Sequence, residues 1–344
     1  MAQFRILSLD GGGIRGAFTA SCLAEMEKRL DRPLVEHFDL IAGASTGGII
    51  AAALACGLSA ADILQMYRRH GEKIFTRGGS IWRVGARQIG TTALHPLLRL
   101  KLGRQSEDLF YARYAEEPLM QALTEVFGER VFESIVKTRL IVPAINLATG
   151  QPTVFKTPHL PDLPRDRKRR VVDILMATTA APTYFPVAVI EPGTAYCDGG
   201  LWANNPGVAA FAEAIKISEK CRRPDLDPAF SVDDVHLLSV GTGLEDYSGM
   251  PPERDIGLLW WGPRILDIMF AAQAQAATFE LIYLLTPNRF HRIDFKTPDT
   301  TWTLDGVKHL DALIAKGETL CKERFDGIKA LFFATPAKAY VPFP

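Results

Sequence analysis

The stretch FRILSLDGGGIRGAF, residues 4–18, indicates the fold class of this chain. Its apolar run Phe4–Leu9 predicts a buried strand, and a helical pattern begins at Ala17, directly after a glycine-rich turn. Glycines let another atom approach the backbone closely, and the first amides of the next helix favour negative charge there. That charge could be a pyrophosphate, since residues 11–16 fit GxGxxG, or the oxyanion of a carbonyl under attack. The loop alone leaves both interpretations open.

The composition is that of a globular protein without a dominant charge. Of the 344 residues, 47% are hydrophobic and 23% are charged, and the 39 basic residues equal the 39 acidic residues. This balance gives no indication of DNA or RNA as a partner. The N-terminus lacks the pattern of a signal peptide, and no run of about 18 apolar residues predicts a transmembrane helix. Any contact with a membrane is therefore expected to be peripheral.

The cysteines indicate a reducing location. They are scattered, odd in number and without a CxxC pair: Cys22, Cys56, Cys197, Cys221 and Cys321. Neither a disulfide framework nor a zinc site is predicted from them. The expected location is the cytoplasm.

Strand and helix patterns alternate along most of the chain. Strands are predicted at residues 38–42, 140–147, 153–156, 194–197 and 235–240, and helices at 17–30, 49–56, 59–67, 114–127, 171–180, from 206, and at 258–285. Repeated strand–helix units predict an α/β sandwich with a mainly parallel sheet. Residues 71–108 are glycine-rich and irregular, and we interpret them as a lid-like insertion.

A candidate nucleophile lies between the second strand and the helix that follows it. Gly43-x-Ser45-x-Gly47 has the strand–turn–helix setting that a nucleophile elbow requires. The flanking glycines permit a tight turn that lifts the serine hydroxyl above the end of the sheet. This setting favours catalysis over a plain tight turn.

A serine hydroxyl needs a base, and the histidines are poor candidates. His236 is at the entry of a strand, His309 is in a helical pattern, and His291 has no neighbouring turn to expose it. A Ser–His–Asp triad is therefore poorly supported. Asp198 follows a short strand and precedes two glycines, so its carboxylate could accept the serine proton. On the motif Asp-Gly-Gly alone, an ordinary turn is the preferred interpretation.

Taken together, these motifs resemble those of the patatin-like phospholipases. DGGGIRG (10–16), GASTG (43–47) and DGG (198–200) occur in the order of that family. ATTAAPTYFP (177–186), NNP (204–206), LLSVGTG (237–243) and residues 260–285 also look like segments of the family. Only residues 71–108 and the last few residues lack an obvious counterpart.

The resemblance implies a fold and a set of site residues. The fold would be a three-layer α/β sandwich with a mainly parallel central sheet and helices on both faces. Residues 1–344 would form one domain, with 257–344 as its C-terminal helical part. Ser45 would be the nucleophile and Asp198 its base, without a histidine, a metal or a cofactor for the chemistry. Gly11, Gly12, Gly13 and Arg15 would form or support the oxyanion hole, and the substrate would be a membrane glycerophospholipid.

The resemblance also implies a regulator. Some bacterial members are antiphage effectors that a cyclic di- or oligonucleotide from a partner nucleotidyltransferase activates, and they then act peripherally on the inner membrane. A homo-oligomer is compatible with this. The basic run Arg165–Arg170 could bind nucleotide phosphates or anionic lipid, although a solvated charged loop is the simpler interpretation.

Alternative functions remain at this point. One is a constitutive lipase without a nucleotide ligand, and another is a storage or scaffold protein. A third, a dinucleotide-dependent dehydrogenase, is weakened because Asp39 begins the second strand whereas such folds place an acidic residue at its end.

Overall fold

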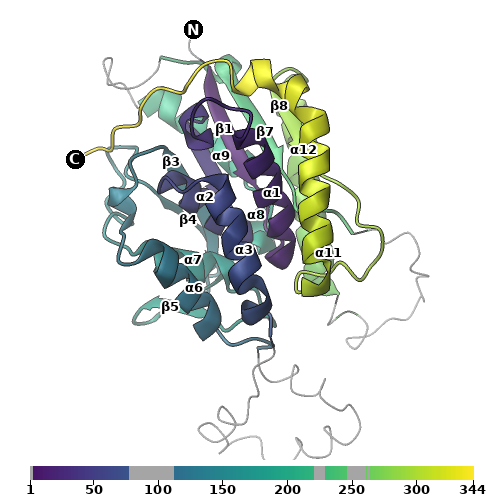
Figure 1. Cartoon of the computed structure of the whole chain (residues 1–344). Coiled ribbons are helices and arrows are strands. Elements are labelled where there is room, and N and C mark those ends of the chain that lie inside the picture. The colour runs from purple at the N-terminus through teal and green to yellow at the C-terminus, as the bar shows by residue number, and fades with distance from the viewer. Residues whose placement is uncertain (1–2, 77–111, 221–228, 246–260, 262–263) are drawn as a thin grey trace, which may run out of the picture.

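A computed structural model describes residues 3–76, 112–220, 229–245, 261 and 264–344 (Figure 1). Within these residues an eight-stranded mixed sheet forms the centre of the molecule. Its strands are β1 (Phe4–Leu9), β2 (Leu40–Gly43), β3 (Arg139–Asn146), β4 (Gln151–Lys156), β5 (Ala188–Glu191), β6 (Thr194–Asp198), β7 (Val235–Val240) and β8 (Phe290–Ile293). Their order is β5-β6-β3-β2-β1-β7-β8, with β4 paired to β3.

The parallel strands determine where the loops meet. β1 pairs in parallel with β2 and with β7, β2 pairs with β3, and β7 pairs with β8. Leu9 at the end of β1 lies opposite Gly43 of β2 on one side and Val240 of β7 on the other. The loops that follow these three strands therefore leave one edge of the sheet side by side. The chain reverses its strand order around β1, and ligand sites of open α/β sheets occur at such a point.

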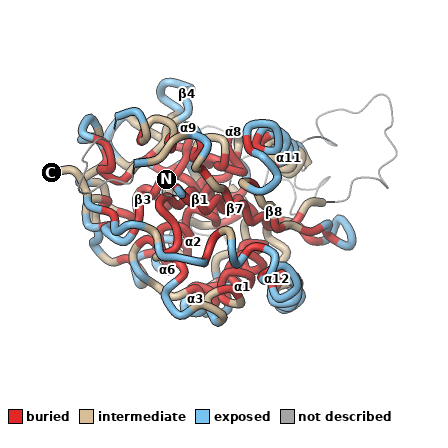
Figure 2. The backbone as a smooth tube through the Cα atoms, turned by 90° about the horizontal axis from the view of Figure 1, so that it is seen from above, coloured by how far each residue is buried: buried red, intermediate tan, exposed pale blue. Residues whose placement is uncertain are grey.

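Helices cover both faces of the sheet, which confirms the predicted three-layer architecture (Figure 2). Leu7 and Leu9 belong to one apolar core, whereas Phe4 and Ile6 belong to the other, because alternate residues of a strand face opposite sides. The helices over the first face are α1 (Gly16–Glu27), α2 (Thr46–Ala55), α3 (Ala60–Ile74), α6 (Glu117–Phe127), α7 (Val171–Thr179) and α12 (Leu310–Phe332). The second face is covered by α9 (Gly207–Lys220) and α11 (Ile265–Leu284).

Several predicted boundaries differ from the structure. α2 begins at Thr46 rather than at residue 49, because its first turn includes both glycines after the serine. α3 runs to Ile74, capped by the Ser59 side chain, so the interpretation that residue 71 begins an irregular insertion is wrong. Most of that predicted insertion, residues 77–108, lies outside the described residues. The strands β5 and β8 were not predicted.

The C-terminal part of the chain is less purely helical than expected, because β8 joins the sheet between α11 and α12. The sequence predicted no transmembrane helix, but α11 has the length and the mean hydropathy, 1.3, of a membrane span, and 28% of its most apolar window is buried. Length and composition alone are weak evidence that a single helix spans a membrane. The buried residues of α11, including Phe270 and Leu281, pack on the domain, and β8 follows it directly into the sheet. We therefore describe α11 as a surface helix with an exposed apolar side.

Two cysteines meet between the first and last long helices. Cys22 of α1 and Cys321 of α12 lie side by side, with their Cα atoms 5.3 Å apart, a separation that disulfide-bonded cysteines also have. The sequence predicted no disulfide framework, and a single pair is not a framework. The two residues are separated by 299 positions, and only the packing of α1 against α12 brings them together.

Candidate active site

The turn between β2 and α2 holds Ser45 in a strained conformation. Its φ of 51° and ψ of −125° lie in a region that residues with a side chain rarely adopt. The surrounding atoms maintain the turn, since the Ser45 amide donates to Thr178 Oγ1 at 3.0 Å. A Cβ on Gly43 would overlap the carbonyl of Gly47, so the GxSxG glycines are a steric requirement. This geometry is that of a nucleophile elbow.

Asp198 reaches Ser45 because two different strands, first β2 and then β6, pair with the same edge of β3. β4 occupies one edge of β3 over residues 141–146, while β2 pairs with the other edge only over 139–141. β6 pairs with residues 144–146, so it takes the edge that β2 leaves at the serine turn. Asp198 lies opposite Ala144, and its Oδ2 accepts a hydrogen bond from Ser45 Oγ at 2.7 Å. The structure thus brings the two predicted residues together from positions 153 apart.

The Asp198 carboxyl is fully buried, and burial raises its pKa to about 7. The hydrogen bonds from Ser45 Oγ and from the Gly200 amide, at 2.7 Å, act in the opposite direction by stabilising the carboxylate. A pKa near neutrality suits a general base, which must accept and then return a proton.

No described histidine is hydrogen-bonded to this pair. His236 and His291 lie against the ring of Phe332. His159 is buried beside Glu213, whose Oε1 lies 3.0 Å from its Nε2. His70 lines the same cavity as Ser45, and its printed ion pair is with Glu125, 3.6 Å away.

The glycine loop after β1 presents two backbone amides. In the described part of the chain, the amides of Gly12 and Gly13 have no hydrogen-bond acceptor, whereas those of their neighbours do. The Gly11 amide donates to the Asn204 carbonyl at 3.0 Å, and the Ile14 amide donates to the Leu304 carbonyl at 2.8 Å. Gly13 lines the same cavity as Ser45 and has a φ of +57°. Gly12 and Gly13 are therefore the loop amides available to an oxyanion.

Gly11 and Arg15, which were also predicted for the oxyanion hole, have other contacts. A Cβ on Gly11 would lie 3.1 Å from Ser45 Cβ, so this glycine allows the loop to pass close to the serine. Arg15 Nη1 donates to Glu245 Oε1 at 3.1 Å, and its side chain lines a separate polar cavity behind the loop. Because its amide is already paired, Gly11 is not a donor in this geometry, and Arg15 supports the loop from behind.

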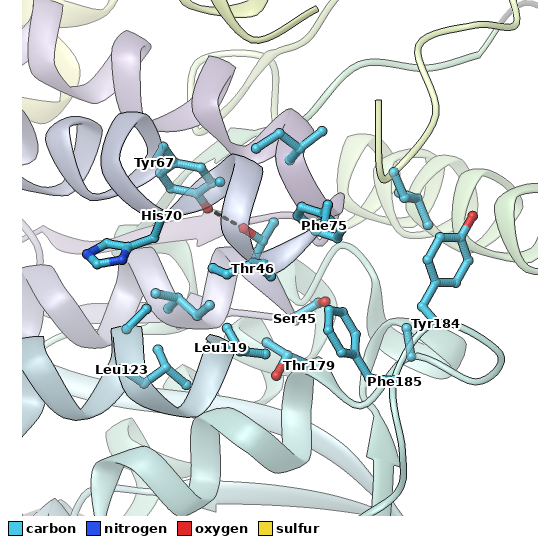
Figure 3. Close-up of a pocket in the computed structure, with 18 of the residues that line it drawn as sticks. Ser45, Thr46, Tyr67, His70, Phe75, Leu119, Leu123, Thr179, Tyr184 and Phe185 are labelled. Carbon is cyan, nitrogen blue, oxygen red and sulfur yellow. Dashed lines mark hydrogen bonds between the residues drawn. The ribbon is translucent and has the colours of Figure 1, made fainter. Parts of the chain in front are cut away.

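An apolar cavity opens beside Ser45 (Figure 3). It lies between α3, α6 and the segment that follows α7 and is open to solvent on one side. Its walls include Ile74, Leu119, Leu123 and Phe185, and the Thr46 hydroxyl bonds to the Tyr67 hydroxyl within it. Such a lining suits a hydrocarbon chain. Sequence reasoning did not find this cavity, because helices from distant parts of the chain form it.

Buried charges hold the loop bearing Asp10. Arg292 of β8 donates two hydrogen bonds to the Asp10 carboxylate, at 2.8 and 2.6 Å, and a third to Asp294 Oδ2 at 2.6 Å. Burial raises the pKa of Asp10 to about 6, while the charge of Arg292 lowers it in part. The sequence did not predict that Arg292 supports the loop, and no spacing in the sequence signals this role.

The basic run at residues 165–170 is engaged in ion pairs. Its partners are acidic side chains from its own loop and from neighbouring segments: Arg165 and Arg169 with Asp166, Arg167 and Lys168 with Glu133, Arg169 with Glu191, and Arg170 with Glu129 and Asp173. The simpler interpretation, a charged surface loop, therefore fits the structure better than an anion site.

Comparisons with known proteins agree on one family. A family model described as patatin-like phospholipase matches residues 7–211. A Vibrio cholerae protein named cGAMP-activated phospholipase is 34% identical, over 98% of this chain and 96% of its own length. Escherichia coli and Pseudomonas aeruginosa proteins of the same name are 35% and 32% identical, over 98% and 93% of this chain and 95% and 86% of their own.

Proposed function

Because this chain belongs to the patatin-like phospholipase family, we propose that it hydrolyses fatty acyl esters of membrane glycerophospholipids through Ser45 and Asp198. The observation that carries the proposal is the 2.7 Å hydrogen bond from Ser45 Oγ to Asp198 Oδ2, on the wall of an apolar cavity. Membership of the family makes the protein a hydrolase, and the dyad and the lipid substrate are the parts that we propose.

In the first half of the reaction, Ser45 Oγ attacks the ester carbonyl carbon while Asp198 Oδ2 accepts its proton. The carbonyl oxygen becomes an oxyanion, and the Gly12 and Gly13 amides donate hydrogen bonds to it. When the intermediate collapses, the bond to the leaving alkoxide breaks, and Asp198 returns the proton to it. The products are a lyso-lipid and an acyl-Ser45 ester.

In the second half, Asp198 accepts a proton from a water molecule, which attacks the acyl carbonyl. The second tetrahedral intermediate uses the same two amides, and its collapse releases the fatty acid and returns a proton to Ser45 Oγ. One carboxyl group serves both halves because its pKa of about 7 lets it both accept and give up a proton at neutral pH.

The exposed side of α11 supports contact with a lipid surface. Large apolar side chains are exposed along this helix and just before it: Trp261, Ile265, Met269, Phe279, Ile282, Tyr283 and Leu284. Another residue of the helix, Phe270, lines the cavity that contains Ser45. One side of α11 is exposed to solvent and apolar, and the other side contributes to the cavity wall. Binding of the exposed side to the bilayer surface would place the cavity next to the lipid. We propose that the protein acts peripherally on the cytoplasmic side of the inner membrane.

We also propose that a cyclic dinucleotide, supplied by a partner nucleotidyltransferase, controls the activity in antiphage defence. The support is that three relatives named cGAMP-activated phospholipase match nearly the whole chain. The alternative is a constitutive lipase of lipid turnover.

The test is fatty acid release from phosphatidylethanolamine–phosphatidylglycerol vesicles, with and without cGAMP and other cyclic di- and trinucleotides. We expect release only with one nucleotide, and a loss of about a thousandfold or more in Ser45→Ala and Asp198→Asn. Equal release without nucleotide would establish the constitutive alternative. Full activity in either folded variant would refute the dyad, and no release by the native protein under any condition would contradict the proposed substrate.

A further inference from the structure

The peptide group between Gly11 and Gly12 is fixed by two residues outside the glycine loop. The Gly11 carbonyl accepts a hydrogen bond from Thr242 Oγ1 at 2.9 Å and a longer one from Asn204 Nδ2 at 3.4 Å. The Gly11 amide donates to the Asn204 carbonyl at 3.0 Å. Gly11 is therefore held from both sides, and the next amide along the chain, that of Gly12, is one of the two without an acceptor among the described residues.

The geometry of the peptide bond connects these contacts to catalysis. A trans peptide is planar, and its C=O and N–H point in opposite directions. A hydrogen bond that fixes the direction of the Gly11 carbonyl therefore also fixes the direction of the Gly12 N–H. Oxyanion donors act because they are oriented before the charge develops, so the residue that holds this plane contributes to the rate.

Thr242 is itself held firmly. It follows β7 in the segment Gly241-Thr242-Gly243 and is only 4% exposed. The Gly241 amide donates to the Ile293 carbonyl at 2.9 Å, and the Gly243 amide donates to Asp294 Oδ1 at 2.9 Å. A Cβ on Gly12 would overlap the Thr242 side chain, so the hydroxyl sits directly against the loop. The strand next to β1 thus supplies a rigid support for the loop that follows β1.

We infer that Thr242 is a positioning residue for ester hydrolysis: its hydroxyl holds the Gly11 carbonyl and thereby aims the Gly12 amide at the developing oxyanion. Asn204 lies six residues after Asp198. Its side-chain amide also donates to the Gly11 carbonyl, and its backbone carbonyl accepts from the Gly11 amide, so it connects the glycine loop to the chain segment that carries Asp198. This inference rests on the proposed function, because it assigns a role within the same site.

The test compares Thr242→Val, which removes the hydroxyl at nearly constant volume, with Thr242→Ser, which retains it. On a short soluble ester, we expect kcat to fall about tenfold or more in the valine variant, with KM within about twofold of the native value. The serine variant should recover most of kcat. A trifluoromethyl ketone, whose adduct with the serine carries an oxyanion, should bind the valine variant more weakly by a similar factor.

Several outcomes would overturn the inference. They are native kcat in Thr242→Val, an equal loss in the serine and valine variants, and an unchanged affinity for the ketone. Thr242→Ala removes the same hydroxyl with less bulk and gives a second measurement if the valine variant is unstable. Failure of the proposed function is distinguishable, because the native protein would then show no hydrolysis that depends on Ser45.

Discussion

Replacing Asp198 by Asn should make the protein inactive and, at neutral and alkaline pH, more stable. Burial raises the pKa of this carboxyl from 3.8 to about 7, so the folded protein holds it in its charged form at a cost. Asparagine has nearly the same shape and cannot ionise. Its carbonyl oxygen can still accept from the Gly200 amide, and its amide can donate to Ser45 Oγ.

Proton linkage gives the direction and the size of the change in stability with pH. Between pH 3.8 and about 7 the folded state retains the proton that the unfolded state releases, so the stability from this group falls as pH rises through that window. A rise of about three pKa units corresponds to roughly 4 kcal/mol when fully developed. We expect the stability of Asp198→Asn, relative to native, to increase by about 3 kcal/mol from about pH 5 to about pH 8.

The assay is thermal unfolding of both proteins at the two pH values. For a chain of this length the increase corresponds to about 4 °C in the difference between their Tm values. Any effect of altered packing on Tm that does not depend on pH is the same at both pH values and therefore cancels in the comparison. Asp326→Asn, at an exposed position of α12, controls for the loss of a carboxylate. A difference in Tm that is the same at both pH values would refute the buried, ionised base.

Two further predictions concern the cavity and α11. Gly71 lines the cavity, and a Cβ at this position would lie 2.7 Å from Ile14 Cδ1. Gly71→Leu should therefore lower the ratio of the hydrolysis rates of long-chain and short-chain esters. The control Gly327→Leu, where a Cβ meets no atom within 4 Å, should leave this ratio unchanged. Phe279→Ser should weaken vesicle binding about tenfold or more in sedimentation without slowing a soluble ester, whereas Val189→Ser, exposed on β5, should do neither.

The parts of the site that the sequence predicts are those carried by local patterns. Ser45 is recognisable because a strand, two glycines and a helix occur together within a few residues. Strand–helix alternation also predicts the parallel pairing of β1 with its neighbours, but it does not predict the order of the strands in the sheet. The same reasoning missed β5 and β8 because, unlike the equally short β2, neither strand is followed by a glycine-rich turn and a helix.

The remaining features depend on contacts between distant segments. The cavity is formed by α3 and α6, and the ion pairs of the basic run use acidic residues such as Glu133 and Glu191. No local pattern reports that an arginine has a distant carboxylate as partner. A charged run alone therefore cannot distinguish an anion site from a neutralised loop, whereas the structure can.

The catalytic arrangement depends on which strand pairs with which edge. Three loops leave the adjacent ends of β2, β1 and β7. They carry the proposed nucleophile Ser45, the Gly12 and Gly13 amides, which have no acceptor among the described residues, and the Thr242 hydroxyl that bonds to the Gly11 carbonyl. The proposed base reaches the site in a different way, because among the described residues no strand parallel to β2 places a carboxylate within hydrogen-bond distance of Ser45 Oγ. β2 ends early at Gly43, and antiparallel β6 takes its place on β3, which puts Asp198 level with the serine. The short second strand is therefore a condition for a serine–aspartate pair, since a longer β2 would occupy the edge that β6 needs.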